Sequence, residues 1–126
     1  MSKLITSLKE AMLEAGLRDG MTISFHHHLR NGDQVLNQVL VQAAQMGVKD
    51  LTVEASSLFD VHLPLIDHIK AGVVTGLNTN YMSGGIGRHI SEGVLNKPVR
   101  FRSHGGRPDT IDSGRVVIDI AFVAAP

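Results

Sequence analysis

Apolar residues follow two alternating periodicities along this chain. Residues 3–16 carry apolar side chains on one helical face, namely Leu4, Ile5, Leu8, Met12 and Ala15. This spacing predicts an amphipathic helix. Short apolar runs bounded by glycine or polar residues recur at 21–25, 51–55, 73–77, 99–103 and 116–124. Runs of this length with such boundaries are typical of strands.

Helical patterns separate these runs. Further helices are expected over a segment from Val35 to Ala44 that ends at Gly47, and near 62–71, 86–95 and 108–113. Strands that alternate with helices predict right-handed βαβ units. The fold class is therefore α/β, with a mostly parallel sheet of about five strands and flanking helices. Two acids, Glu54 and Asp119, fall within apolar strands. Arg100 and Arg102 are candidate structural partners for Asp119, but the strand order that such a pair requires is not determined by the sequence.

Composition limits the classes of protein to which the chain can belong. Its 126 residues suit a single α/β domain over 1–126, and 43% of them are hydrophobic. Twelve basic residues balance twelve acidic ones, so no net charge favours nucleic acid or a membrane surface. There is no cysteine, no apolar run near the roughly 20 residues of a membrane span, and no apolar signal core. We expect a cytoplasmic protein. Because it stops after the apolar run 116–125, we also expect a portion of a longer subunit.

The segment Arg102-Ser103-His104-Gly105-Gly106-Arg107 is the sharpest candidate site. It follows a predicted strand, and Pro108 then suits the first turn of a helix. Glycine N–H groups, a helix N-terminus and arginine all favour bound carboxylate or phosphate. No acid lies between Glu92 and Asp109, so the local field is positive if the basic side chains converge. The alternative is a solvated edge strand with a histidine-capped turn.

Three consecutive histidines, His26 to His28, open the first strand-to-helix connection. They predict an active-site lining, or alternatively a polar strand end whose histidines bond backbone groups. An extended backbone points at most two of them the same way. A metal would then need His62, His104 or a carboxylate as a third ligand, and we expect none. His62, His68 and His89 lie on predicted helices and are expected at the surface or as satisfied, partly buried side chains.

A third candidate is the connection from Asn78 to Gly87, which reads NTNYMSGGIG. Three glycines near a helix start can cradle a phosphate or carboxylate with backbone N–H groups. Alternatively this is a tight turn in which Gly84, Gly85 and Gly87 are required for close packing of helix on sheet.

Four stretches together carry a resemblance to a known family. They are GMTISFHHHLRNGD at 20–33, VVTGLNTNYMSGGIG at 73–87, RSHGGR at 102–107 and IDIAFVAAP at 118–126. In this order they resemble the N-terminal part of the citrate lyase alpha chain, a CoA-transferase-like family built from two similar α/β halves. The resemblance implies a citrate CoA-transferase that exchanges acetate for citrate on an acyl-carrier thioester. It leaves open whether this chain alone is complete and active.

The resemblance also implies roles for residues and partners. Citrate-binding candidates are His27, His28, Arg30, Asn31, Ser103, His104, Gly105, Gly106 and Arg107. Candidates for the carrier's phosphoribosyl-dephospho-CoA arm are Asn80, Tyr81, Ser83, Gly84 and Gly85. The catalytic carboxylate is expected outside this chain, no cofactor is bound permanently, and no metal is expected. Expected partners are the acyl carrier (gamma) subunit, the lyase (beta) subunit and further copies of the chain. The alternatives are a citramalate-specific relative and a domain that only binds a carboxylate or sugar phosphate.

Overall fold

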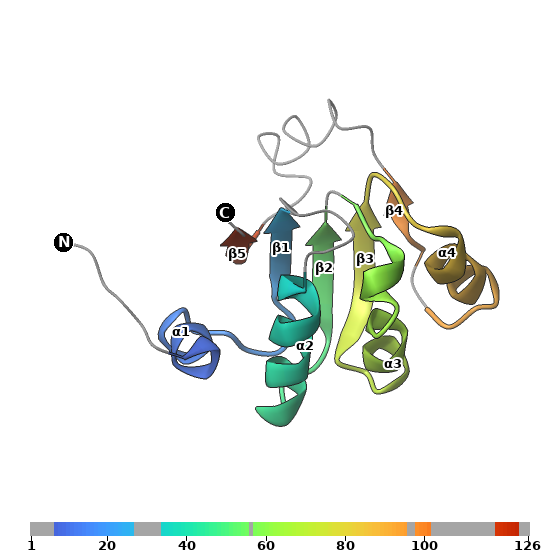
Figure 1. Cartoon of the computed structure of the whole chain (residues 1–126). Coiled ribbons are helices and arrows are strands. Elements are labelled where there is room, and N and C mark those ends of the chain that lie inside the picture. Colours follow the sequence, from blue (N-terminus) through green and yellow to red (C-terminus); the bar gives the residue numbers. More distant parts are fainter. Residues whose placement is uncertain (1–6, 27–33, 56, 96–97, 102–117, 124–126) are drawn as a thin grey trace.

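Helices and strands alternate through the part of the chain that the structure, a computed structural model, describes: residues 7–26, 34–55, 57–95, 98–101 and 118–123. The elements are, in order, α1 (Leu8–Glu14), β1 (Thr22–His26), α2 (Val35–Gln45), β2 (Leu51–Ala55), the 3-10 turn η2 (Asp60–His62), α3 (Leu65–Lys70), β3 (Val74–Thr79), α4 (Gly84–Ser91), β4 (Arg100–Phe101) and β5 (Ile120–Val123) (Figure 1).

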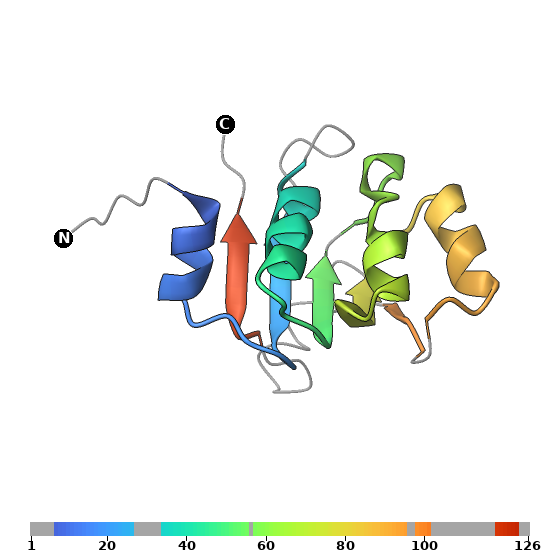
Figure 2. The same ribbon diagram turned by 90° about the horizontal axis from the view of Figure 1, so that it is seen from below.

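The five strands form one sheet in the order β4-β3-β2-β1-β5, and every neighbouring pair is parallel. The predicted α/β class and the parallel sheet are thus confirmed. Successive right-handed crossovers from β1 to β4 step in one direction, which leaves their helices on one face. Figures 1 and 2 show α2 and α3 over the same side of the sheet. The chain then returns past β1, where β5 pairs with its other edge.

The core lies between the sheet and these helices. Ile23, Val53 and Leu77 stand in register on neighbouring strands and are almost fully buried. They belong to one apolar cluster with buried residues of α2 and α3, which are Leu36, Val39, Leu40, Ala43, Leu65, Ile66 and Ile69. At the β5 side, the Phe25 and Phe122 rings stack with centroids 5.3 Å apart. Burial of these apolar faces is the main term that stabilises the layers.

Several element boundaries differ from the sequence-based expectation. The helix expected near 62–71 is divided into η2 and α3, because Pro64 occupies the N-cap of α3 and has no N–H to continue a preceding helix. β3 continues to Thr79, so Asn78 is a strand residue and not a loop residue. β5 begins at Ile120 and not at 116, with residues 118 and 119 described outside it. The helix expected near 108–113 lies outside the described residues.

The candidate ion pair between Asp119 and Arg100 is wrong. Arg100 is on β4 and Asp119 precedes β5, and these strands are the two opposite edges of the sheet. The Asp119 side chain is exposed, and its Oδ2 accepts the Thr22 N–H at 2.8 Å, while the Asp119 N–H donates to the Thr22 carbonyl at 2.9 Å. These two hydrogen bonds of Asp119 therefore connect the start of β5 to the start of β1. Arg102, the other candidate partner, lies outside the described residues.

Candidate functional site

The order of the strands reverses at β1. The chain steps from β1 to β2 on one side, yet β5 pairs with β1 on the other side, with His26 opposite Val123. Such a reversal of strand order opens a crevice at which parallel sheets bind ligands. The connection that begins at residue 27 leaves from this point. Its candidates His27, His28, Arg30 and Asn31 themselves lie outside the described residues.

The second set of citrate-binding candidates follows β4, which ends at Phe101. Ser103, His104, Gly105, Gly106 and Arg107 also lie outside the described residues. Because all strands are parallel, the ends of β1 and β4 belong to the same edge of the sheet. β2 and β3 separate them, so the two connections start three strand positions apart.

The third candidate, the connection from β3 to α4, is fully described, and a neighbouring segment braces it. The Leu58 N–H donates to the Tyr81 carbonyl at 2.9 Å, and the Ser83 N–H donates to the Leu58 carbonyl at 2.8 Å. Thr79 Oγ1 donates to the Tyr81 carbonyl at 2.9 Å. The Tyr81 ring, 50% exposed, packs against Phe59 with centroids 5.6 Å apart. These contacts tie Tyr81 and Ser83 to Leu58 and Phe59 at the carboxyl edge of the sheet.

Helix α4 begins inside this connection, with two glycines in its first turn. Ser83 is the N-cap, and its Oγ accepts the Ile86 N–H at 3.5 Å. The N–H groups of Gly84 and Gly85 precede the first intrahelical hydrogen bond and have no partner within the helix. A Cβ added at Gly84 would meet nothing within 4 Å. Close packing therefore does not require glycine at position 84. This differs from the alternative interpretation of the segment as a tight turn in which Gly84 is needed for packing.

The charge beside these N–H groups limits what they can bind. A Cβ at Gly85 would lie 3.4 Å from Asp60 Oδ1, so a carboxylate already stands next to the positive end of α4. A helix N-terminus carries about half a positive charge, which one nearby carboxylate offsets. The arrangement therefore suits a neutral acceptor such as a carbonyl oxygen better than a doubly charged phosphate.

A row of buried polar residues at this edge was not predicted as a site. Ser24, Glu54 and Asn78 are in register on β1, β2 and β3, and each is at most 8% exposed. By strand alternation they face away from Ile23, Val53 and Leu77, and so away from the helix layer. The signal available in the sequence was Glu54, an acid inside an apolar strand. Asn78 gave no such signal because it was assigned to a loop.

Of the three histidines on helical segments, His62 is buried and hydrogen-bonded, whereas His68 and His89 are partly exposed. His62 is fully buried, and its Nδ1 accepts the Phe59 N–H at 2.9 Å, which matches the expectation of a satisfied histidine. Burial lowers the pKa of His68 from its ordinary value, and the nearby Asp67 carboxylate opposes that shift. Within the described ranges no three His, Asp, Glu or Cys side chains are grouped to hold a metal ion. Nor does any described helix have the length and apolarity needed to cross a membrane.

Comparisons with protein families and with known sequences both match the chain to citrate lyase alpha subunits. The family model of the citrate lyase alpha subunit matches residues 1–126. The citrate lyase alpha chains of Haemophilus influenzae and Klebsiella pneumoniae are 50% and 48% identical to the chain over 124 residues. These alignments cover 98% of this chain and 25% and 24% of the relatives. The chain therefore spans about a quarter of the length of the relatives it matches.

A solved structure is also similar. It is a Streptococcus mutans protein described as an alpha subunit of citrate lyase in complex with citrate. The TM-score is 0.94 at 50% sequence identity, over 97% of this chain and 24% of that one. Similarity of this degree extends to the arrangement of the strands and helices described above.

Proposed function

Because this chain belongs to the citrate lyase alpha subunit family, we propose that it forms one wall of a site where citrate replaces acetate on a carrier thioester. The observation that supports this proposal is the reversal of strand order at β1, because parallel sheets commonly bind ligands at such a position, and residues 27–33 follow β1 in the sequence. The citrate complex of a relative with 50% identity supports citrate as the ligand.

Citrate would be held by the two connections that leave β1 and β4. A ligand with up to three carboxylates needs cationic and N–H donors, and arginine can bind a carboxylate with two parallel hydrogen bonds. The proposed citrate ligands are His27, His28, Arg30, Asn31, Ser103, His104, Gly105, Gly106 and Arg107. Of these, Arg107 is the single residue for which we expect the largest loss of affinity.

The exchange converts acetyl carrier and citrate to citryl carrier and acetate. A carboxylate oxygen adds to the thioester carbonyl, whose oxygen carries the negative charge until the thiolate leaves and an acyl anhydride remains. The thiolate then attacks the other carbonyl of the anhydride, so that a carbon–sulfur bond re-forms and a carboxylate leaves. Preorganised N–H donors stabilise such an oxyanion. We assign to the N–H groups of Gly84 and Gly85 a hydrogen bond to the neutral thioester carbonyl, and contacts with the rest of the carrier arm to Asn80, Tyr81 and Ser83. Asp60 beside Gly85 favours the carbonyl end of the arm at this position over its phosphates.

The remaining parts of the reaction would come from outside this chain. We propose that the catalytic carboxylate belongs to the remainder of the subunit, since the chain spans a quarter of its relatives. The thioester would be delivered on the phosphoribosyl-dephospho-CoA arm of an acyl carrier subunit. A lyase subunit would then cleave the citryl carrier.

Exchange of labelled acetate between free acid and acetyl carrier tests the activity. The chain is assayed alone and then mixed with the remainder of a citrate lyase alpha subunit. We expect exchange only in the mixture, because essential groups lie elsewhere. A folded chain that supports no exchange in either assay would contradict the proposal and favour a domain that only binds its ligand.

Citrate affinity tests the proposed ligands separately. Isothermal titration of Arg107→Ala should show citrate binding weaker by roughly 1.5–3 kcal/mol, or about 10- to 150-fold. Arg88→Ala, a change on the exposed side of α4, is the matched control and should bind citrate as the unaltered chain does. Equal affinities for all three proteins would remove Arg107 from the site.

A further inference from the structure

His62 is a fully buried histidine that the proposed reaction does not use. The Phe59 N–H donates to its Nδ1 at 2.9 Å, and the His62 N–H donates back to the Phe59 carbonyl at 2.8 Å. A backbone N–H can only donate, so Nδ1 has no proton and the neutral imidazole carries its proton on Nε2. This pair of hydrogen bonds closes the η2 turn only while Nδ1 is unprotonated.

The η2 turn and the residues beside it support the connection from β3 to α4. Leu58, just before the turn, exchanges two backbone hydrogen bonds with that connection. The Phe59 ring packs against Tyr81 with centroids 5.6 Å apart. After the turn, a Leu63 methyl group lies 3.4 Å from where a Cβ on Gly85 would stand. The conformation of η2 therefore affects the connection at two separate points.

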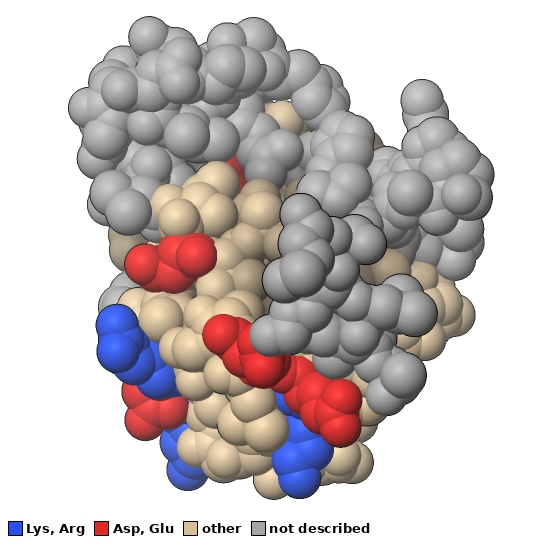
Figure 3. All heavy atoms as spheres, turned by 90° about the vertical axis from the view of Figure 1, so that its left-hand side faces the viewer, with Lys and Arg blue, Asp and Glu red and all other residues tan. Residues whose placement is uncertain are grey.

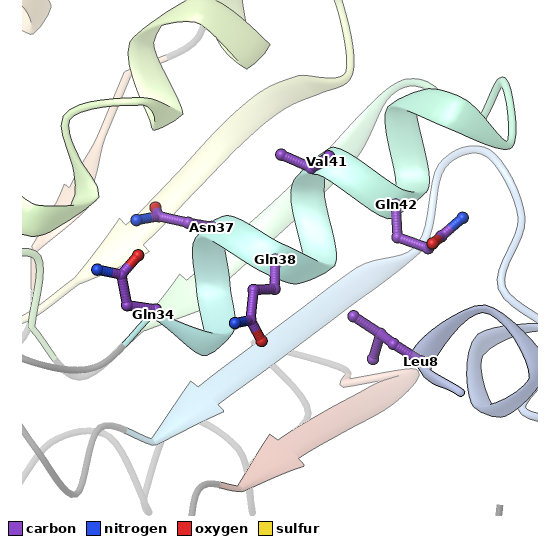
Figure 4. A pocket seen from close by; sticks show the side chains of 6 residues that line it. All are labelled: Leu8, Gln34, Asn37, Gln38, Val41 and Gln42. Atoms are coloured by element: carbon purple, nitrogen blue, oxygen red, sulfur yellow. The ribbon is translucent and has the colours of Figure 1, made fainter. Parts of the chain in front are cut away.

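Helix α2 also holds the turn. Asn37, near the start of α2 (Figure 4), donates from its Nδ2 to the Val61 carbonyl at 2.7 Å, and Val61 is the middle residue of η2. Residues 35–45 of α2 contain no ionisable side chain. This helix therefore offers no acid that would stabilise a positive charge on the imidazole.

The ionisable side chains on the other elements next to η2 lie at or near the surface. They are Asp60 on η2 itself, Asp67, His68 and Lys70 on α3, and Arg88 and His89 on α4. The acids, the lysine and the arginine are exposed, and the two histidines are half-buried. Charged side chains on the side of α1 and β5 are at the surface too (Figure 3). The buried acid Glu54 faces away from the helix layer.

Water screens exposed charges, so they contribute little to a charge that is fully buried. An imidazolium buried at the position of His62 would therefore be poorly compensated. It would also place a second donor against the Phe59 N–H. Both effects favour release of the ring to water before it takes up a proton.

We propose that His62 makes the η2 turn a pH-sensitive switch. In the closed turn the neutral imidazole accepts the Phe59 N–H. A proton taken from water by Nδ1 removes this acceptor, so only the open turn holds the protonated ring. The open turn no longer presents Phe59 to Tyr81, and the connection from β3 to α4 loses part of its support. Only the effect on the carrier arm rests on the proposed function; the switch itself does not.

Linkage gives the expected size of the effect. A histidine in water titrates near pH 6.5, and carboxylates titrate about two pH units lower. Because only the open turn binds the proton, the ratio of open to closed turn rises as the pH falls below about 6.5 and is constant well above it. Between pH 7.5 and pH 5.5 this ratio should rise about tenfold.

Amide hydrogen exchange of the whole chain measures the opening and needs no transferase activity. After correction for the intrinsic rate at each pH, the Phe59 amide should exchange about tenfold faster at pH 5.5 than at pH 7.5. In His62→Asn the side-chain oxygen can replace Nδ1 as acceptor but does not titrate, so the two corrected rates should be equal. His68→Asn, at a half-buried histidine of α3, is the matched control and should keep the tenfold change.

Imidazole nitrogen-15 shifts test the switch without a substitution. Nδ1 of His62 should be unprotonated and Nε2 protonated in the folded chain at pH 7.5, and a proton on Nδ1 at this pH overturns the proposal. So does a Phe59 rate that is the same at both pH values, or a tenfold change that persists in His62→Asn. Equal acceleration in Val74–Thr79 also overturns it, because the whole sheet would then be opening. Loss of acetate exchange with an intact switch would contradict only the proposed function.

Discussion

At Gly76 the backbone of β3 passes close to a side chain of the neighbouring strand. A Cβ at this position would lie 2.6 Å from Thr52 Oγ1 and 3.3 Å from Thr52 Cβ. The register of β2 and β3 shifts next to this pair, between Leu51 and Thr52. Glycine is therefore required here by contact with a β-branched side chain, and its φ is not in the positive range.

Replacement of Gly76 by alanine should lower the free energy of unfolding by about 1–3 kcal/mol, the usual cost of overpacking. Urea denaturation measures this change. In a Thr52→Ala background the same replacement should cost less, because the clashing atoms are gone. Gly84→Ala is the control for glycine replacement, since that position has open space. An equal loss at both glycines would contradict the steric explanation.

His68 should make stability depend on pH. Burial lowers its pKa in the folded state, so below about pH 6.5 the unfolded chain binds the proton first. The free energy of unfolding should therefore fall as the pH drops from 7 towards 5, and less steeply in His68→Gln. Asp67→Asn should steepen the fall, because the Asp67 charge favours the protonated form. Identical pH profiles for His68→Gln and the unaltered chain would rule out this contribution.

Helix α4 is supported at its start by a serine cap and by hydrogen bonds to a neighbouring segment. Its first turn contains Gly84 and Gly85, and glycine is a poor helix former. Ile86 is the only buried residue of α4. The Ser83 cap and the two hydrogen bonds between Leu58 and the 81–83 backbone compensate. The start of this helix is thus determined by contacts with Leu58 as much as by its own sequence.

The cap contribution can be measured directly. Ser83→Ala should destabilise the fold by about 0.5–1 kcal/mol, near the lower end for N-caps because the 3.5 Å hydrogen bond is long. Ser83→Asp should retain the cap. Ser7→Ala, which removes the corresponding cap of α1, gives a comparison with a 3.1 Å hydrogen bond. Melting temperatures of the three variants rank the caps, and no loss in Ser83→Ala would show that the cap is unimportant.

At the scale of the whole molecule, β5 joins distant parts of the chain. Its pairing with β1 brings Asp119 to Thr22 and stacks Phe122 on Phe25. Of the described strands, only β1 pairs with β5. This pairing produces the reversal of strand order that supports the proposed citrate site.

Phe122→Ala should therefore loosen β5 selectively. We expect a loss of about 1–2 kcal/mol for a partly buried aromatic side chain. Amide hydrogen exchange should accelerate in Ile120–Val123 and remain unchanged in Val74–Thr79, which is held between two other strands. Leu13→Ala on α1, a side chain 57% exposed, serves as a control. Uniform acceleration across the sheet would indicate that β5 unfolds together with the core.

The sequence by itself determined the type and approximate position of most elements, because periodicity and the Gly and Pro boundaries are local signals. It also indicated the family, through four ordered stretches. Two predicted boundaries were wrong, one because of strand pairing and one because the local effect of a proline was not applied. Strand pairing extends β3 through Asn78 and Thr79, and Pro64 divides the helical segment before α3.

Only the tertiary structure decided which strands are neighbours. Sequence order does not reveal that β5 returns to β1, so the candidate partner Arg100 for Asp119 was wrong and the row of Ser24, Glu54 and Asn78 was not predicted. The positions of Asp60 beside Gly85 and of Thr52 against Gly76 were likewise not predicted from the sequence. The physical reason is common to all of these: each is a contact between segments far apart along the chain, and local periodicity carries no information about such pairings.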